Sequence, residues 1–410
     1  MDEQVCRFCQ NPLKYNFIDL GMSPLANAYI RPEQLHLKES FYPLHAYVCE
    51  KCFLVQLEEF ENPEQIFTDY AYFSSYSDSW LKHAKGYAGQ AISHFALNDK
   101  SQVVEIASND GYLLQYFKAA NIPILGIEPA TNVAQAAQEK GIPTLMIFFG
   151  SQTARELAAQ GKQADLLIGN NVLAHVPDLH DFVSGIKIIL KPHGVITMEF
   201  PHLLRLMLEN QFDTIYHEHF SYFSFTTVKT VFAAHELVLF DVEELPTHGG
   251  SLRIYACHSS NRTQTITSRV AELLVQEETA GLNKIETFRV FGENVKKIKR
   301  NILEFLIQVK NEGKTVVGYG APAKGNTLLN YCGIRTDFLD YTVDRSPYKQ
   351  GFYLPGTRIP IESPDKVRLT KPEYLFILPW NLKDEIMEQM ACVREWGGKF
   401  VVPIPEIQIL

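Results

Sequence analysis

Val103-Val104-Glu105-Ile106-Ala107-Ser108-Asn109-Asp110-Gly111-Tyr112-Leu113-Leu114 is the stretch of this sequence that decides the fold. Its first five residues are a short apolar run that predicts a buried strand, and the turn at 108–111 leads into a helical stretch. A second strand is predicted over 124–128 and ends in Glu128. A turn of small residues followed by a carboxylate at the end of the next strand is what a dinucleotide or adenosine site in an α/β fold needs.

The turn is poor in glycine, which bears on the kind of ligand. A dinucleotide fold has GxGxxG here, whereas this chain has only Gly111 after Ala107. Without glycines at the helix start, a pyrophosphate has no obvious binding position. S-adenosylmethionine fits better, because it carries no phosphate and its positive groups favour nearby acceptors. An ordinary turn between a strand and a helix is the alternative interpretation.

Strands and helices continue to alternate along the chain on both sides of this unit. The strand predicted over 251–257 follows a tight connection with no crossover helix, so it must pair antiparallel. A parallel sheet with one reversed strand at its end resembles the order of class I methyltransferases. The other predicted elements are helices over 80–95, 179–190 and 228–235, strands over 144–148, 165–169, 195–200 and 237–242, and a turn over 191–194.

A second α/β pattern follows a mainly helical stretch over 264–312. A strand over 315–320 enters a glycine-containing turn and then a helix, and further strands are predicted over 338–344 and from Tyr374. Lys324 lies in the turn at the start of that helix, where a lysine favours phosphate. The sequence thus predicts an α/β fold with two Rossmann-like regions.

Four of the seven cysteines form two CxxC pairs, Cys6 with Cys9 and Cys49 with Cys52. Two such pairs can supply a tetrahedral site of four thiolates, which suits Zn²⁺. Four protein ligands leave no open position, so we expect a structural metal ion. A redox pair or chance pairing are the alternatives. The other three cysteines, Cys257, Cys332 and Cys392, are expected to be buried apolar side chains.

Composition excludes several classes of function. The 410 residues carry 38 basic and 47 acidic side chains, a net charge of −9, which disfavours binding to nucleic acid. No apolar run approaches the roughly 20 residues of a membrane span. No signal peptide is visible, so we expect a cytoplasmic protein with reduced cysteines.

The segment Tyr216-His217-Glu218-His219-Phe220-Ser221-Tyr222-Phe223-Ser224 concentrates polar and titratable side chains in nine residues. It follows the fifth predicted strand, near the carboxyl edge where α/β sheets bind ligands. It is not the HExxH zinc motif, because the second histidine directly follows the glutamate. Structural histidines usually occur singly, so this cluster is a candidate catalytic site.

The sequence resembles S-adenosylmethionine-dependent C-methyltransferases that act on nucleotide-linked 4-keto-deoxyhexoses, enzymes of deoxysugar biosynthesis. The resemblance covers nearly the whole chain and departs from the family at Ala107, where glycine is frequent. It rests on the double CxxC, Glu105-Ile-Ala-Ser-Asn-Asp-Gly-Tyr-Leu-Leu114, Tyr216-His-Glu-His-Phe-Ser-Tyr222, His248-Gly-Gly-Ser-Leu-Arg253 and Gly318-Tyr-Gly-Ala-Pro-Ala-Lys-Gly-Asn326.

The resemblance implies that a base removes the C3 proton beside the 4-keto group and that the enolate carbon attacks the sulfonium methyl group. It assigns the base to His219, an imidazole that titrates near neutrality. Glu218 and Tyr216 would orient the base or hold the sugar, His175 would steady the enolate oxygen, and Tyr70 would reach the site from the N-terminal region. Expected cofactor contacts are Glu105, Ala107, Asn109, Gly111, Tyr112, Glu128, Pro129, Asn170 and Asn171. Expected contacts to a nucleotide-sugar substrate, dTDP-linked, are Arg253, Gly320, Lys324, Gly325 and Asn326.

We expect three domains: a zinc-binding domain over 1–75, a methyltransferase domain over 76–262, and a nucleotide-sugar-binding α/β domain with a helical lead-in over 263–410. The alternative is an NAD(P)-dependent nucleotide-sugar oxidoreductase, which the partial fingerprint Gly318-x-Gly320 would favour. A zinc-knuckle adaptor for nucleic acid or protein is a third interpretation, which the net charge disfavours.

Overall fold

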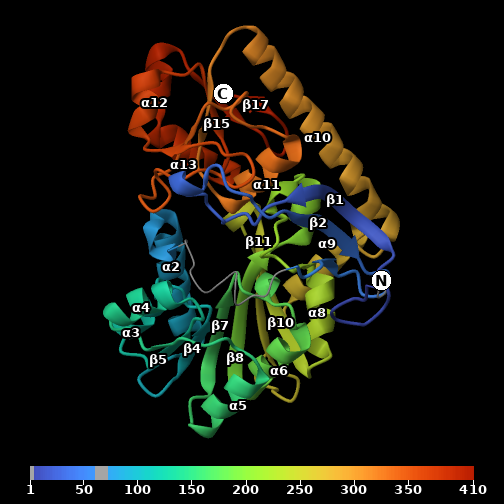
Figure 1. Cartoon of the computed structure of the whole chain (residues 1–410). Coiled ribbons are helices and arrows are strands. Elements are labelled where there is room, and N and C mark those ends of the chain that lie inside the picture. The colour runs from blue at the N-terminus through green and yellow to red at the C-terminus, as the bar shows by residue number, and fades with distance from the viewer. Residues whose placement is uncertain (1–3, 61–72) are drawn as a thin grey trace.

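Three β-sheets organise the protein in the computed structural model, which describes residues 4–60 and 73–410 (Figure 1). The largest sheet lies in the middle of the sequence, the second is near the N-terminus, and the third forms the C-terminal region. This confirms the predicted α/β class. No helix in the described ranges combines the length and apolar character that a membrane crossing needs.

The seven-stranded sheet has the order β10-β11-β8-β7-β4-β5-β6. Its inner strands pair in parallel, and β11 is antiparallel to both β8 and β10, which confirms the predicted reversed strand. The strands are β4 (Val103–Ile106), β5 (Ile124–Ile127), β6 (Thr144–Leu145), β7 (Ala164–Asn170), β8 (Leu190–Pro201), β10 (Leu237–Leu245) and β11 (Ser251–His258). Helices α2 (Asp78–His94), α3 (Leu114–Ala119), α4 (Thr131–Glu139), α5 (Ser151–Ala159), α6 (Leu179–Ile189), α7 (Leu203–Leu208) and α8 (Phe225–Ala233) belong to the same region.

Two local predictions in this sheet were wrong. The strand expected over 144–148 ends at Leu145, and Met146, Ile147 and Phe148 beyond it are partly exposed. The turn expected over 191–194 belongs to β8, where a shift in register against β7 accommodates the extra residues. This register shift is a β-bulge, and a β-bulge can contain residues that a sequence pattern assigns to a turn.

The N-terminal sheet has the order β1-β2-β3-β9 and is antiparallel. Strands β1 (Tyr15–Ser23), β2 (Tyr42–Val48) and β3 (Val55–Leu57) come from the cysteine-rich region, but β9 is Ser221–Tyr222. The polar cluster after the fifth predicted strand therefore completes a sheet whose first strand, β1, begins at Tyr15. This pairing fixes the cluster against the N-terminal region.

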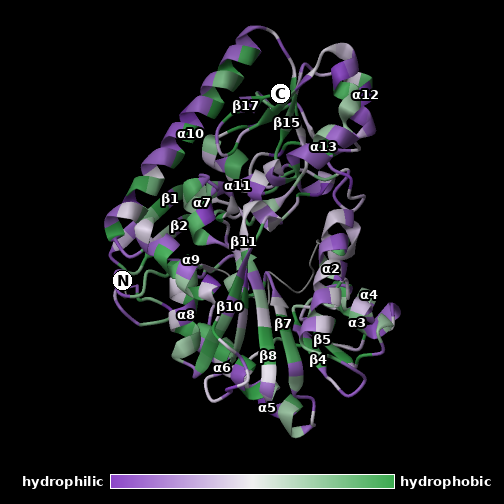
Figure 2. Cartoon of the chain, turned by 180° about the vertical axis from the view of Figure 1, so that it is seen from behind, coloured by the Kyte–Doolittle hydropathy of each residue, from purple (hydrophilic) through white to green (hydrophobic). Residues whose placement is uncertain are grey.

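Helices α9 (Ser268–Thr279) and α10 (Ile285–Asn311) connect the central and C-terminal regions. In Figure 2, α10 alternates between polar and apolar residues along its length, while β7, β10 and β11 are largely hydrophobic. The α10 ring of Phe291 stacks on Phe17 of β1, with centroids 4.7 Å apart. The apolar face of α10 thereby joins the N-terminal and C-terminal sheets into one core.

The C-terminal sheet has the order β14-β13-β12-β15-β16-β17, parallel except for β17. The strand predicted over 338–344 is much shorter, Thr342–Val343, and the helix predicted after the glycine-containing turn begins at Ala323. The elements are β12 (Val316–Tyr319), α11 (Ala323–Cys332), β13 (Thr342–Val343), β14 (Ile361–Glu362), α12 (Asp365–Thr370), β15 (Tyr374–Ile377), α13 (Lys383–Gln389), β16 (Lys399–Val402) and β17 (Gln408–Ile409).

Candidate active site and metal centre

A cavity of about 710 Å³ lies where the three sheets meet. Its walls come from the carboxyl ends of β4, β5 and β7, from the polar cluster before β9, and from the start of α11. The N-terminal region contributes Asn27 and Glu59, and the C-terminal region contributes Lys324 and Lys349. Predicted site residues that line this cavity are Ala107, Asn109, Tyr112, Glu128, Pro129, Asn170, Asn171, His175, Tyr216, His219 and Lys324.

The turn after β4 brings its backbone to the cavity. Ala107 and Asn109 both adopt positive φ, 55° and 49°, which L-residues rarely do and which often marks a ligand site. Glu128 follows β5 and accepts hydrogen bonds from the backbone N–H groups of Asn109 and Ala130, each at 2.9 Å. Burial raises the pKa of Glu128, opposed by these two donors. A carboxylate has further lone pairs, so Glu128 can still accept hydroxyl groups such as those of a ribose.

The end of β7 supplies two asparagines to the same wall. The Asn170 amide lies 3.4 Å from the hydroxyl of Tyr112, and the backbone N–H of Asn171 donates to the carbonyl of Glu199 at 2.7 Å. Asn171 also has positive φ, 53°. Backbone carbonyls, amides and a carboxylate thus surround the space where a ligand with a cationic sulfur and hydroxyl groups would fit.

Two predicted cofactor contacts lie behind the wall. Glu105 is fully buried within β4, and burial raises its pKa well above the usual value. Gly111 has φ of 76°, and a Cβ there would come within 2.8 Å of Ile142. Neither residue lines the cavity. Glu105 and Gly111 can therefore affect a ligand only indirectly, through the position of the turn after β4.

His219 is held in one tautomer by the backbone. Its Nδ1 lies 3.0 Å from the carbonyl oxygen of Thr214, which can only accept, so the proton is on Nδ1. Burial and then the neighbouring His175 lower the pKa of His219 well below 6.5. The ring is therefore neutral near pH 7, with the lone pair on Nε2.

Two aromatic rings pack against this imidazole. The Tyr216 ring centroid is 4.1 Å from that of His219, and the His175 centroid is 4.7 Å away in an edge arrangement. Burial lowers the pKa of His175 to about 4, opposed by a hydrogen bond from its ring to the backbone carbonyl of Glu218. A neutral imidazole has only one N–H, and in His175 this bond occupies it.

Glu218 is buried beside the cavity without lining it. Its Oε1 accepts a hydrogen bond from Asn27 Nδ2 at 2.6 Å. Burial raises the pKa of Glu218 to about 7, so the carboxyl group can hold or release a proton near neutrality. Tyr70, the remaining expected catalytic residue, lies outside the described residues.

Lys324 reaches the cavity from the first turn of α11. Its Nζ donates to Asn381 Oδ1 at 2.9 Å and lies 4.7 Å from the ring centroid of Trp380. Burial lowers the pKa of Lys324, and the carboxylate of Asp213 opposes that shift. The C-terminal region thus brings a cation to the wall of the same cavity as His219.

The other expected substrate contacts lie elsewhere. Asn326 is buried, and its side chain donates to the carbonyl of Ala26 at 2.6 Å. Gly320 and Gly325 pack so closely against Pro379 and Leu378 that a side chain would collide or crowd there. None of these three lines the cavity.

Arg253 is also outside the cavity wall. Its Nε donates to Glu199 at 2.8 Å and its Nη1 to Glu243 at 3.0 Å, and its guanidinium lies over the ring of Tyr87. Those carboxylates hold the guanidinium in the sheet. The geometry therefore agrees better with a structural role for this strand residue than with a substrate contact.

Several cavity residues were missed by sequence reasoning. Asn27 comes from a distant part of the chain, and no local pattern marks it. His248 lines the cavity and stands directly before Gly249 and Gly250, so the quoted HGG motif was a usable signal.

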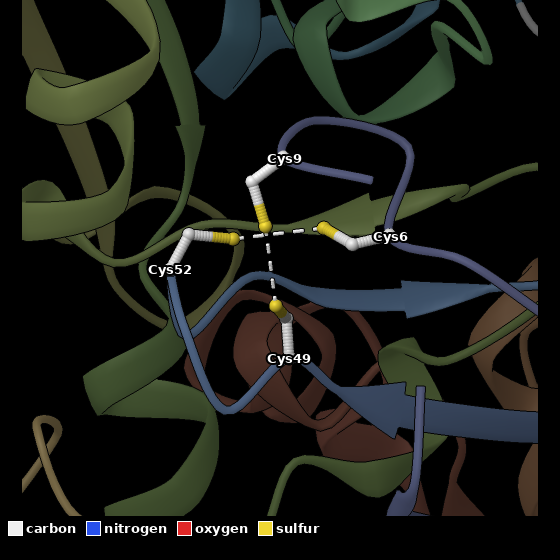
Figure 3. Close-up of side chains that lie close together, drawn as sticks. All are labelled: Cys6, Cys9, Cys49 and Cys52. Atoms are coloured by element: carbon white, nitrogen blue, oxygen red, sulfur yellow. Dashed lines mark hydrogen bonds between the residues drawn. The ribbon is translucent and has the colours of Figure 1, made fainter. Parts of the chain in front are cut away.

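The four N-terminal cysteines converge on one point, as Figure 3 shows. The sulfurs of Cys6 and Cys52 lie 3.6 Å apart and those of Cys9 and Cys49 lie 3.4 Å apart. With Zn–S bonds of about 2.3 Å, a tetrahedral site needs sulfurs separated by about 3.8 Å. The four thiols therefore fit a tetrahedral Zn²⁺ ion.

Hydrogen bonds to the sulfurs also favour thiolates. The Gln56 side-chain amide lies 3.2 Å from Cys6 Sγ, and the Lys51 backbone N–H lies 3.4 Å from Cys49 Sγ. Such donors orient metal-bound sulfurs. The three remaining cysteines are buried free thiols, as predicted: Cys257, Cys332 and Cys392.

Family models match consecutive parts of the chain. One described as a zinc binding domain matches residues 6–67, and one described as a methyltransferase domain matches residues 80–241. A third, described as a C-methyltransferase C-terminal domain, matches residues 246–405.

One relative matches the chain along nearly its full length, and other proteins match parts of it. The chain is 35% identical to C-methyltransferase NovU of Streptomyces niveus over 405 residues, which cover 99% of this chain and 96% of that protein. A ubiquinone biosynthesis O-methyltransferase of Bartonella tribocorum is 26% identical over 99 residues, 24% of this chain and 40% of that protein. The structure of a magnesium protoporphyrin IX methyltransferase from Synechocystis PCC 6803 aligns at 14% identity and a TM-score of 0.34, over 44% of this chain and 83% of that one.

The full-length relative and the family matches favour methyl transfer over the nicotinamide-dependent oxidation considered as the alternative. They agree with the reversed strand β11 and with the four-cysteine cluster. The chain therefore belongs to the family of S-adenosylmethionine-dependent C-methyltransferases.

Proposed function

We propose that this enzyme methylates a ring carbon, C3, of a nucleotide-linked 4-keto-deoxy sugar by way of an enolate. The observation that carries the proposal is the hydrogen bond from His219 Nδ1 to the Thr214 carbonyl. Because that bond fixes the proton on Nδ1, the basic lone pair of Nε2 is available at the cavity, where a C–H group beside a ketone can meet it.

A carbon acid needs a base because carbon, unlike a hydroxyl oxygen, has no lone pair with which to attack a methyl group. A 4-keto group acidifies the neighbouring C3 proton, and a neutral imidazole can remove it. His219 takes this proton at Nε2 and becomes an imidazolium, which the carbonyl of Thr214 stabilises through Nδ1.

The neighbouring side chains have supporting roles in this proposal. Tyr216 packs against the base and would contact the sugar, and Glu218, held by Asn27, would accept a hydrogen bond or relay the proton. His175 packs against the base and bonds to the Glu218 carbonyl, which fits an orienting role better than donation to the enolate oxygen. Tyr70 remains a proposed contact on the strength of the family resemblance alone.

S-adenosylmethionine supplies an electrophilic methyl group on a sulfonium centre. The residues proposed to hold it are the positive-φ backbone at Ala107 and Asn109, the carboxylate of Glu128 for the ribose hydroxyls, and Asn170 with Asn171. Tyr112 and Pro129 complete this wall, and Glu105 and Gly111 support it from behind.

The anionic part of the substrate would face the C-terminal region. Lys324 brings a positive charge to the cavity wall at the start of α11, where the unpaired N–H groups of the helix also favour an anion. We propose a contact from Lys324 to the diphosphate of a dTDP-linked sugar. Gly320, Gly325 and Asn326 would shape that turn, and Arg253 would act within the sheet.

We further propose that the four-cysteine cluster holds a structural Zn²⁺ ion and that the enzyme works in the cytoplasm, where the thiols stay reduced. All four ligands come from the protein, so the ion has no open position for chemistry. The domain limits expected above, 1–75, 76–262 and 263–410, stand as part of this proposal.

The test is mass spectrometry of reactions that contain S-adenosylmethionine and a panel of 4-keto nucleotide sugars. We expect one substrate to gain the mass of one methylene group, and NMR of that product to place the methyl group on C3. A protein that binds S-adenosylhomocysteine but methylates none of these ketones would refute the proposed substrate class and leave the methyltransferase family intact.

A further inference from the structure

His248 has an unusual backbone for a histidine. It lies within the 3₁₀ turn Thr247–Gly249 with φ of 55° and ψ of 18°. Non-glycine residues rarely adopt this left-handed conformation, and it persists only where the surrounding structure enforces it. The turn is closely packed at the next residue, because a Cβ at Gly249 would come within 2.5 Å of the Trp380 ring.

This backbone aims the His248 ring at the cavity. The ring lines the cavity and packs against Trp80, with centroids 5.3 Å apart. Its Nε2 lies 3.3 Å from the side-chain amide nitrogen of Asn171. His248 therefore stands between the proposed cofactor wall and the wall that carries His219 and Lys324.

The contact with Asn171 determines where the His248 proton is. An amide NH₂ can only donate, so Nε2 accepts and the proton is on Nδ1. Burial first, and then the charge of Lys324, lower the pKa of His248 to about 4, which keeps the ring neutral. Within the described ranges, no hydrogen bond involves Nδ1, so its N–H is available to a ligand.

Three imidazoles line the cavity in the described part of the chain, and His248 is the one whose N–H does not donate to a backbone carbonyl there. His219 uses its N–H on the Thr214 carbonyl, and His175 uses its N–H on the Glu218 carbonyl. A developing enolate oxygen needs a donor. The sequence-based expectation gave that role to His175, but the hydrogen bonds favour another ring.

We infer that His248 is a catalytic residue, whose Nδ1–H donates a hydrogen bond to the ketone oxygen as this oxygen becomes an enolate. This role rests on the proposed function. His219 Nε2 takes the proton on the carbon, the C–H electron pair becomes the new C=C bond, and the C=O π pair moves to the oxygen. The enolate carbon then bonds to the methyl group, the C–S bond breaks with its electron pair on sulfur, and the ketone re-forms. His248 keeps its proton throughout, and His219 later releases its proton to water.

Two replacements of His248 are compatible with its left-handed backbone, and together they distinguish a hydrogen-bond donor from a side chain that only packs. Glycine adopts positive φ freely and asparagine does so more easily than most residues. His248→Gly removes the donor, whereas His248→Asn places an amide N–H close to the former Nδ1. We expect kcat of His248→Gly to fall about 100-fold or more, as for loss of an oxyanion donor. His248→Asn should recover at least about tenfold of that loss, with affinity for S-adenosylhomocysteine unchanged in both variants.

A second measurement does not depend on turnover. In protein labelled with ¹⁵N-histidine, the His248 signals, identified by their loss in His248→Asn, should show a proton on Nδ1 and a lone pair on Nε2. A proton on Nε2 would overturn the inference, because Nδ1 would then be an acceptor.

The kinetic outcomes are equally decisive. An active wild type with an equally active His248→Gly variant refutes the role of His248 alone. A His248→Gly variant that loses S-adenosylhomocysteine affinity and keeps kcat would make His248 a cofactor contact instead. A wild type that methylates no ketone refutes the proposed function, and the catalytic role of His248 with it.

Discussion

The indole Nε1 of Trp380 donates a hydrogen bond to Asp213 Oδ2 at 2.7 Å, and this bond joins the C-terminal region to the segment that carries the proposed base. Asp213 directly precedes Thr214, whose carbonyl accepts from His219. A second bond, from Thr327 to the carbonyl of Ile215 at 3.0 Å, ties the same segment to α11. The C-terminal region therefore contributes to the orientation of the base besides supplying Lys324.

Loss of this link should lower turnover without lowering cofactor affinity. In Trp380→Phe the indole donor is gone, so the Thr214 carbonyl and His219 lose part of their support. We expect kcat to fall by about tenfold, since small misplacements of a catalytic group are costly. Asp213→Asn keeps an oxygen that accepts from Trp380 and should retain most of the activity. An unchanged kcat in Trp380→Phe would contradict this positioning role.

Asp213 should also leave a signature in the pH dependence of stability. Burial raises its pKa from 3.8 to about 6, opposed by Lys324. The folded state thus binds a proton more tightly than the unfolded state, so this group contributes stability below pH 3.8 that is lost as the pH rises through about 6. The free energy of unfolding of Asp213→Asn, measured by urea titration, should therefore improve relative to wild type between those pH values. Parallel pH curves for the two proteins would exclude a raised pKa at Asp213.

His219→Asn is the sharpest test of the base. The asparagine amide can still donate to the Thr214 carbonyl, as Nδ1 does, but it has no basic nitrogen in place of Nε2. Methyl transfer should fall by about 10²- to 10⁴-fold, the usual contribution of a general base. Titration calorimetry with S-adenosylhomocysteine should give nearly wild-type affinity. The exposed His193, changed to Asn, is the matched control and should remain fully active; turnover of His219→Asn at the same rate would place the base elsewhere.

Much of the fold was predictable because it depends on local patterns. The strand at 103–106, its turn and the acid at Glu128 follow from an apolar run, small residues and a carboxylate in order. The reversed β11 follows from the short connection before it. Each of these features depends on a few consecutive residues. Hydrophobic periodicity and turn-forming residues were therefore sufficient to predict them.

The site was only partly predictable because long-range contacts complete it. Asn27 reaches Glu218 across 191 positions, and Trp380 reaches Asp213 across 167, and neither pair leaves a pattern in the sequence. The two-residue strand β9 is too short to show alternation, although it anchors the catalytic cluster to β3. The tautomers of His219 and His248 likewise depend on partners that only the folded chain supplies.

The metal cluster should contribute to folding. Replacing Cys49 with Ala removes one of four thiolates, so Zn²⁺ content should fall and the melting temperature should drop with it. Cys332→Ala is the matched control, because Cys332 is buried far from the cluster in the sequence and should cost only about 1 kcal/mol with metal content intact. Atomic emission and thermal denaturation measure the two quantities. A wild-type protein without zinc and a Cys49→Ala variant of unchanged melting temperature would remove the structural metal from the proposal.

Glu277 anchors α9 to the start of α8. Its carboxylate accepts from His202 Nε2 at 2.7 Å and from the backbone N–H groups of Phe225 and Thr226 at 2.6 and 2.8 Å. Both members of the His202–Glu277 pair are almost wholly buried, so removing the carboxylate leaves His202 and the start of α8 without their acceptor. Breaking a buried pair of this kind costs about 3–5 kcal/mol. We expect Glu277→Ala to lose stability on that scale, whereas the exposed neighbour Glu278→Ala should change it little.

The same contact predicts acid sensitivity. Burial works against ionisation of Glu277, but the hydrogen bonds from His202 and Thr226 outweigh it and hold its pKa below 4.5. The stability that this carboxylate contributes is thus present above pH 4.5 and is lost as the pH falls through the lowered pKa. Urea titrations from pH 7 down to pH 3 should show a steeper loss of stability in wild type than in Glu277→Ala. If the two proteins lose stability in parallel, Glu277 is not ionised in the folded state, and the His202–Glu277 contact is a neutral hydrogen bond.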